Sequence, residues 1–179
     1  MIEFTLPYHC RARVWLGELP QASYLADYTV ERSIEAKSPD FNNVRLAAVE
    51  LREPKGPRVL YGLLGAEFRP LKSNNLDLQV NVSSNDNLRI ADSSLNQSGD
   101  ILVGLPKEYI DSVVRGVFDI GEKADGIFAG TLLFNCAAHS IVGSSESIFR
   151  RLSYIVVQIL FSPKNTLSEH DLSKIFIPE

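Results

Sequence analysis

Two short motifs contain residue types that bind metal ions in proteins. Cys136 and His139 are separated by two alanines, and His9 directly precedes Cys10 near the start of the chain. Two thiolates and two imidazoles could hold a tetrahedral zinc ion if the N-terminal strand lies beside the strand that leads to Cys136. Because Cys-x-x-His is a loose pattern and Cys10 lies on an apolar strand face, a small buried thiol is the favoured interpretation of Cys10. We therefore expect no metal ion and no other cofactor.

A second chemistry would use His139 as a general base for Ser144 or Ser145. These serines directly precede Glu146 and a helical pattern, where hydroxyl groups commonly cap free backbone amides. The surrounding Gly-Ser-Ser-Glu-Ser sequence also lacks the second glycine of a nucleophile elbow. No G-x-x-x-x-G-K-[ST] loop is present, so we expect neither nucleotide binding nor GTPase activity. We expect a protein that is not an enzyme, and a site built on Cys136, His139 and Ser144 is the least favoured alternative.

Arginines occur in two places where they could contact phosphate. Arg11 and Arg13 alternate along one strand face with Trp15, whose ring could stack on a base or form a dimer contact. Arg150 and Arg151 are adjacent on a predicted helix, where a solvated face is the simpler interpretation. The chain has 18 basic and 22 acidic residues, which give a net charge of −4. This balance argues against general binding to phosphate backbones, so any contact with nucleic acid is expected to be local.

The first half of the chain is predicted to be rich in strands. Five stretches show period-2 alternation or a dense run of Val, Leu and Ala: residues 10–16, 28–35, 44–51, 59–68 and 76–82. Proline and glycine at 38–40 and 53–57 predict turns. Gly62 and Gly65 predict a bulge or a close approach of another segment. Residues 83–99 are polar and poor in apolar anchors, so they are predicted to form a loop insertion.

The second half is predicted to place a central strand between two helices. Pro106 suits the first turn of a helix whose apolar positions run from Ile110 to Val117. The apolar run 127–134 predicts the strand. A second helix is expected to begin after Ser144-Ser145, to end at Ser162-Pro163 and to turn four apolar residues toward the core: Ile148, Leu152, Ile155 and Ile159. A short terminal piece should pack Leu172, Ile175 and Phe176.

Several of these residues occur in an order that resembles domain IV of the translational GTPase elongation factor G. The sequence LPKEYI at 105–110 is similar to the start of that domain's first helix. It is followed by Gly130 in the next strand, by His139 in the loop after that strand, and by the Ser-Ser-Glu of residues 144–146 with Phe149 at the next helix start. Upstream, a similar strand with glycine and tyrosine carries Arg58, Tyr61, Gly62, Phe68, Pro70 and Leu71. The resemblance covers residues 58–161, with 83–99 as an insertion.

The resemblance implies an α+β fold in which a β-sheet is covered on one side by two helices and contains a βαβ arrangement. It also implies that loops at one end of the sheet form a tip, which in elongation factor G enters the decoding region of the ribosome. The corresponding residues here are Lys55 and Arg58 in the first tip loop, and His139 in the second, which spans residues 135–143. This chain departs from the family at 135–138, where the sequence Asn-Cys-Ala-Ala replaces an acidic residue and a glycine.

These observations predict a single domain over residues 1–179, in which a β-rich part, 1–57, extends the part 58–161. With 179 residues and 45% hydrophobic content, one core needs no disulfides. Two distant cysteines and the lack of a bilayer-length apolar run favour a cytoplasmic protein without a membrane partner. The predicted function is a non-enzymatic module that binds the ribosome or another RNA–protein complex through its tip loops. The alternative is a protein-interaction or scaffold domain, for which a homodimer is one form, without RNA contact.

Overall fold

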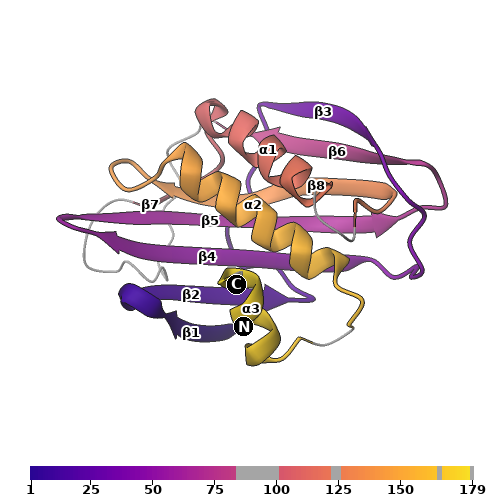
Figure 1. The fold of residues 1–179 in the computed structure, drawn as a ribbon. Coiled ribbons are helices and arrows are strands. Elements are labelled where there is room, and N and C mark those ends of the chain that lie inside the picture. The colour runs from indigo at the N-terminus through magenta and orange to yellow at the C-terminus, as the bar shows by residue number, and fades with distance from the viewer. Residues whose placement is uncertain (84–100, 122–125, 165–166, 178–179) are drawn as a thin grey trace.

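The computed structural model describes residues 1–83, 101–121, 126–164 and 167–177. In these residues an eight-stranded sheet carries three α-helices, and the helices lie on one face of the sheet (Figure 1). The strands are β1 (Ile2–Leu6), β2 (Cys10–Leu16), β3 (Tyr28–Glu35), β4 (Arg45–Lys55), β5 (Arg58–Pro70), β6 (Asn75–Val82), β7 (Ile101–Val103) and β8 (Gly130–Ser140). The helices are α1 (Ile110–Gly121), α2 (Glu146–Phe161) and α3 (Glu169–Phe176), and two 3-10 turns are η1 (Pro7–His9) and η2 (Lys107–Tyr109).

The strand order shows how the N-terminal part joins the rest of the sheet. The order is β1-β2-β4-β5-β8-β6-β3, and β7 pairs separately with β8. Neighbouring strands are antiparallel except β6 and β8, which run parallel and are separated in sequence by β7 and α1. The predicted α+β character is confirmed, and the sheet is larger than the resemblance implies because β1, β2 and β3 extend it at both edges.

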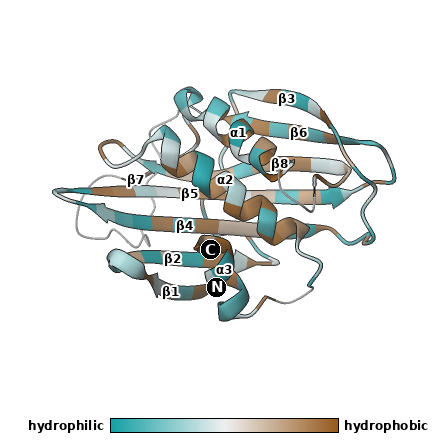
Figure 2. Ribbon diagram, viewed as in Figure 1, coloured by the Kyte–Doolittle hydropathy of each residue, from teal (hydrophilic) through white to brown (hydrophobic). Residues whose placement is uncertain are grey.

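Each face of the sheet has its own apolar cluster. The larger cluster lies on the helix side, where Ala47, Val49 and Leu51 of β4 pack with Leu152 and Ile155 of α2. Apolar residues are concentrated in the middle of β4 and in the part of α2 above it (Figure 2). A smaller cluster occupies the opposite face and consists of Ala22, Tyr61, Leu63, Ile101, Cys136 and Ala138. The alternation predicted for the strands therefore separates two buried layers.

Helix α2 begins and ends where the sequence predicts. The Ser145 hydroxyl accepts a hydrogen bond from the backbone N–H of Ile148 at 3.4 Å, and the helix ends at Phe161 before Ser162. The guanidinium of Arg45 donates to the backbone oxygens of Leu160 and Ser162 at 2.9 and 2.6 Å. These bonds satisfy carbonyl groups that have no partner within a helix end. The four predicted core residues of this helix are buried.

The terminal segment packs against the first strand. Helix α3 starts with a capping box in which Ser168 and Asp171 bond each other's backbone N–H groups. Its buried Leu172 and Phe176 face the core, and the rings of Phe176 and Phe4 meet edge to face at 5.1 Å. The predicted short terminal piece is therefore a helix that covers part of β1. In the described part of the chain, no helix is long and apolar enough to cross a membrane.

Two glycine predictions are confirmed by the packing of β5. A Cβ atom at Gly62 would lie 2.7 Å from Leu152 Cδ1 of α2, so the absence of a side chain lets the helix approach the strand. The register of β5 against β8 shifts between Gly65 and Ala66, which is the expected bulge. The loop predicted over 83–99 lies outside the described residues, apart from Ser83.

The predicted strand 127–134 is wrong in its bounds. Strand β8 spans Gly130–Ser140, so residues 135–140, the first part of the loop predicted over 135–143, continue the sheet. They do so because partners distant in sequence supply hydrogen bonds. Ser23 bridges Cys136, and all three residues of β7 pair with residues 138–140. The second tip loop is correspondingly shorter than predicted.

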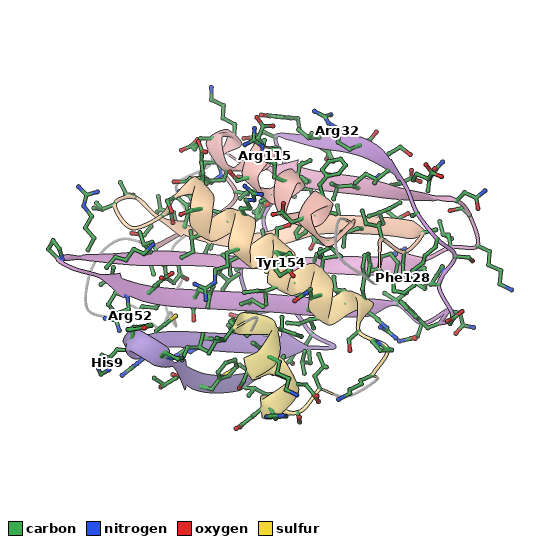
Figure 3. The ribbon with its side chains drawn as sticks, in the orientation of Figure 1. His9, Arg32, Arg52, Arg115, Phe128 and Tyr154 are labelled. Carbon is green, nitrogen blue, oxygen red and sulfur yellow. The ribbon has the colours of Figure 1, made fainter. Side chains whose placement is uncertain are left out.

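Helix α1 contacts α2 through Gly116, and this contact generates a test of the packing. A Cβ at Gly116 would overlap the carbonyl oxygen of Arg150 and the side chain of Ser153, whose hydroxyl donates to the Val113 oxygen at 2.7 Å. Gly116→Ala should lower the free energy of unfolding by about 1–3 kcal/mol, measured by urea denaturation. Arg115→Ala, on the exposed side of the same helix (Figure 3), should change it by less than about 0.5 kcal/mol. Equal effects of the two substitutions would contradict the close helix contact.

Candidate functional site

The hairpin between β4 and β5 presents two basic side chains next to each other. A turn at Gly56-Pro57 joins the strands, and Gly56 has a φ of 60°, which favours glycine. Lys55 and Arg58 are directly opposite in the strand register, and both are exposed. Lys55 Nζ lies 4.0 Å from Glu53 Oε1, whereas Arg58 forms no ion pair within the described residues. Like charges in this position destabilise a strand pair, so stability does not explain them.

The loop between β8 and α2 packs beside the same hairpin. The backbone N–H of Tyr61 donates to Gly143 O at 2.9 Å, and the Ser144 hydroxyl donates to Tyr61 O at 2.7 Å. Two apolar side chains in this loop are unusually exposed, Ile141 at 67% and Val142 at 83%. The two predicted tip loops therefore lie at the same end of the sheet, on the left in Figure 1.

His139 lies at this end but is not on a loop. It belongs to β8, pairs with Leu102 of β7 and is 7% exposed. Its Nδ1 lies 3.1 Å from Gly104 O, and because a carbonyl oxygen can only accept, Nδ1 carries the proton of this bond. The interpretation of His139 as a loop residue is therefore wrong. The ring is bonded to the backbone of Gly104 and forms part of the wall of a hollow.

The hollow beside His139 has a volume of about 440 Å³. It is lined by Leu102, Pro106, Lys107, Glu108, Tyr109, Ser140 and Ile141. The Tyr109 ring stacks on Phe149 with centroids 4.5 Å apart and lies 6.5 Å from the His139 ring. Burial raises the pKa of Tyr109, and the nearby carboxylates of Glu108 and Glu146 raise it further. Its hydroxyl group therefore stays protonated at neutral pH and can donate a hydrogen bond.

Lys107 and Tyr109 are site residues that the sequence interpretation missed. Both belong to the LPKEYI segment, which was assigned only to the start of a helix. The available signal was their place beside Pro106 at a predicted helix start, because segments that connect elements lie at the surface and often carry function. What the sequence could not show is that β7 brings this segment against the end of β8.

The residues considered for catalysis are not brought into one site. Cys136 belongs to the cluster on the face opposite the helices, where its Sγ lies 3.7 Å from Pro20 O. Ala137 belongs to the helix-side cluster, and His139, two residues further along β8, lies on that side, near Tyr109. Ser144 is engaged by backbone groups of Tyr61 and Ser140.

The zinc arrangement also has no geometric basis. It required β2 to lie next to β8, but β4 and β5 separate these strands. Cys10 lies in the helix-side cluster and Cys136 in the opposite one. Among the described residues, no three His, Cys, Asp or Glu side chains are close enough to share a metal ion.

The two thiols give a chemical test of this assignment. Burial raises the pKa of Cys136 from 9.0 to about 12, so its thiolate fraction at pH 8 is about a thousandfold below that of the unfolded chain. The thiol ionises at a lower pH in the unfolded chain than in the folded protein. Cys136 therefore lowers the free energy of unfolding as the pH rises above 9. We expect iodoacetamide to leave Cys136 unmodified in the folded protein and to alkylate it in urea, as measured by mass spectrometry. Rapid alkylation of the folded protein at neutral pH would restore the nucleophile hypothesis.

The buried position of His139 gives a second test. His139→Ala removes a buried ring and leaves Gly104 O without its partner, so it should lower the free energy of unfolding by about 1–3 kcal/mol. His170→Ala, at an exposed position of α3, should have little effect in the same urea titration. Similar stability of the two variants would contradict the buried position of His139.

Comparison with known proteins gave no assignment of the chain. No protein-family model matched the sequence, and no curated protein sequence matched it. The resemblance to domain IV of elongation factor G therefore rests on the order of the motifs in the sequence. The observations that describe the site are its geometry and charge: a like-charged hairpin end, an apolar loop beside it and a hollow that contains Tyr109 and His139.

Proposed function

We propose that the protein is a non-enzymatic module related to domain IV of elongation factor G that binds the ribosome or another RNA–protein complex. The contact surface consists of the hairpin end, residues 55–58, and the neighbouring loop, residues 141–145. One observation carries the proposal. Lys55 and Arg58 stand directly opposite each other at a projecting end of a chain whose net charge is −4. A local positive end on an acidic protein favours an anionic partner contacted at that end.

Two features of the fold support the proposed relation. Strands β6 and β8 are parallel and have α1 between them in sequence, which is the βαβ arrangement that the resemblance implies. The helices lie on one face of the sheet, and the two loops that correspond to the tip lie at one end (Figure 1). The exposed Ile141 and Val142 add an apolar contact beside the positive charges.

The proposal is tested by sedimentation of lysate through sucrose gradients at low and moderate salt. We expect the tagged wild-type protein to migrate with ribosomal particles, and salt to weaken this migration because the contact is electrostatic. The variant Lys55→Ala, Arg58→Ala should remain at the top of the gradient. His139→Ala is unsuitable for this purpose, because a loss of binding could follow from unfolding.

The matched control is Arg32→Ala, Lys72→Ala. It removes the same total charge, but from β3 and from the connection between β5 and β6, where both side chains are exposed. Migration with ribosomes that survives in this control and is lost in the hairpin variant would assign the contact to the hairpin end. Wild-type protein that stays at the top under every condition would refute the proposal.

One observation favours the second candidate function, a homodimeric interaction domain. Strand β3 pairs only with β6 among the described strands, and most of its residues are exposed, including Tyr28 at 48%. Such an edge can pair with a second copy of the same strand. A dimer in light scattering, together with no migration with ribosomes, would make this function the better assignment.

A further inference from the structure

The face of the sheet opposite the helices carries a row of arginines from β2 and β4. On β2, Cys10, Ala12 and Val14 belong to the helix-side core, so Arg11, Arg13 and Trp15 point to the other face. Trp15 is half-buried against the small cluster on that face. Its ring is therefore held in place by packing against that cluster.

Arg13 is neutralised by carboxylates. Its Nε lies 3.3 Å from Glu3 Oε2 and 3.7 Å from Glu50 Oε2. Glu50 is 1% exposed and accepts a hydrogen bond of 2.8 Å from the Tyr61 hydroxyl. The positive charge of Arg13 is thus fully offset by Glu3 and Glu50, and the three side chains form an ion-pair group of the folded structure.

Arg11 and Arg52 are different. They are directly opposite in the register of β2 and β4, which places two guanidinium groups on the same face of neighbouring strands. Within the described residues, neither forms an ion pair, and Arg52 Nε is buried without a hydrogen-bond partner. Arg11 is exposed, and Arg52 lies at the same end of the sheet as His9 (Figure 3). Two like charges in direct opposition destabilise the strand pair in the absence of an anion between them.

We propose that Arg11 and Arg52 together bind a phosphate group of an RNA strand. A guanidinium donates two parallel hydrogen bonds to phosphate oxygens, and one phosphate placed between two guanidiniums would offset their repulsion. Arg52 precedes Lys55 by three residues on β4, so the two side chains point to opposite faces, and the arginine pair is a second contact near the hairpin end. The inference rests on the proposed function and names the RNA backbone as the group recognised. A backbone contact of this kind carries no base preference.

The test uses fluorescence anisotropy with a labelled short single-stranded RNA, titrated at several salt concentrations. Arg11→Gln and Arg52→Gln should each weaken binding similarly for different base sequences. Because both arginines contact the same phosphate, each substitution should lower the slope of log Kd against log salt by at most about 0.7, and the double variant should lower it no further. Arg32→Gln, an exposed arginine on β3, should leave affinity and slope unchanged. Without RNA, Arg11→Gln should melt at the same temperature as the wild type or higher, whereas a purely structural arginine would lower it.

Three results would overturn the inference. The first is an RNA affinity and a salt slope that do not change in Arg11→Gln and Arg52→Gln. If the variant Lys55→Ala, Arg58→Ala still failed to migrate with ribosomes, the proposed function would stand and only the arginine site would be refuted. The second is a lower melting temperature of Arg11→Gln, which would indicate a structural role. The third is wild-type protein that binds no RNA but is stabilised by inorganic phosphate through both arginines, which would assign the pair to a free phosphate.

Discussion

The hydrogen bonds of β8 join the two halves of the sheet. One edge of this strand pairs with β5 and thereby with β4, β2 and β1. Its other edge pairs in turn with β6, with the bridge from Ser23 and with β7. Backbone groups of a central strand must all find partners, because an unpaired buried N–H or C=O costs free energy. The pairing of β8 with β5 includes a β-bulge, where the register shifts between Gly65 and Ala66.

Local patterns predicted the elements that depend on local forces. Period-2 alternation gave β2, β3 and β6, and the serines before Glu146 gave the start of α2, because side-chain direction and capping are set by neighbours in sequence. The end of β8 was missed because Asn135–Cys136–Ala137–Ala138 has little strand propensity of its own. That segment is a strand because β7 and residues 22–23 pair with it, and such long-range partners leave no local pattern.

The residues of the candidate site also differ in whether local sequence patterns could predict their positions. Lys55 and Arg58 could be placed on one hairpin from the breaker residues between two apolar runs, and the structure places them there. His139 was assigned to a loop, because the extension of β8 depends on partners distant in sequence. The opposition of Arg11 and Arg52 could not be predicted at all, since it is a property of strand register, and a slip of one residue would place the two side chains on opposite faces. The register places Arg13 opposite the carboxylate of Glu50, and it places Arg11 and Arg52 opposite each other.

The contact between Phe4 and Phe176 has a consequence for the order in which the domain can be completed during synthesis. Strand β1 precedes all the other described elements in the chain, whereas α3, the helix that covers it, follows them all. Until α3 has emerged, part of the apolar face of β1 is open to water, and an edge strand with an open apolar face can associate with other chains. The domain would therefore need protection at β1 from the time this strand is made until α3 has emerged.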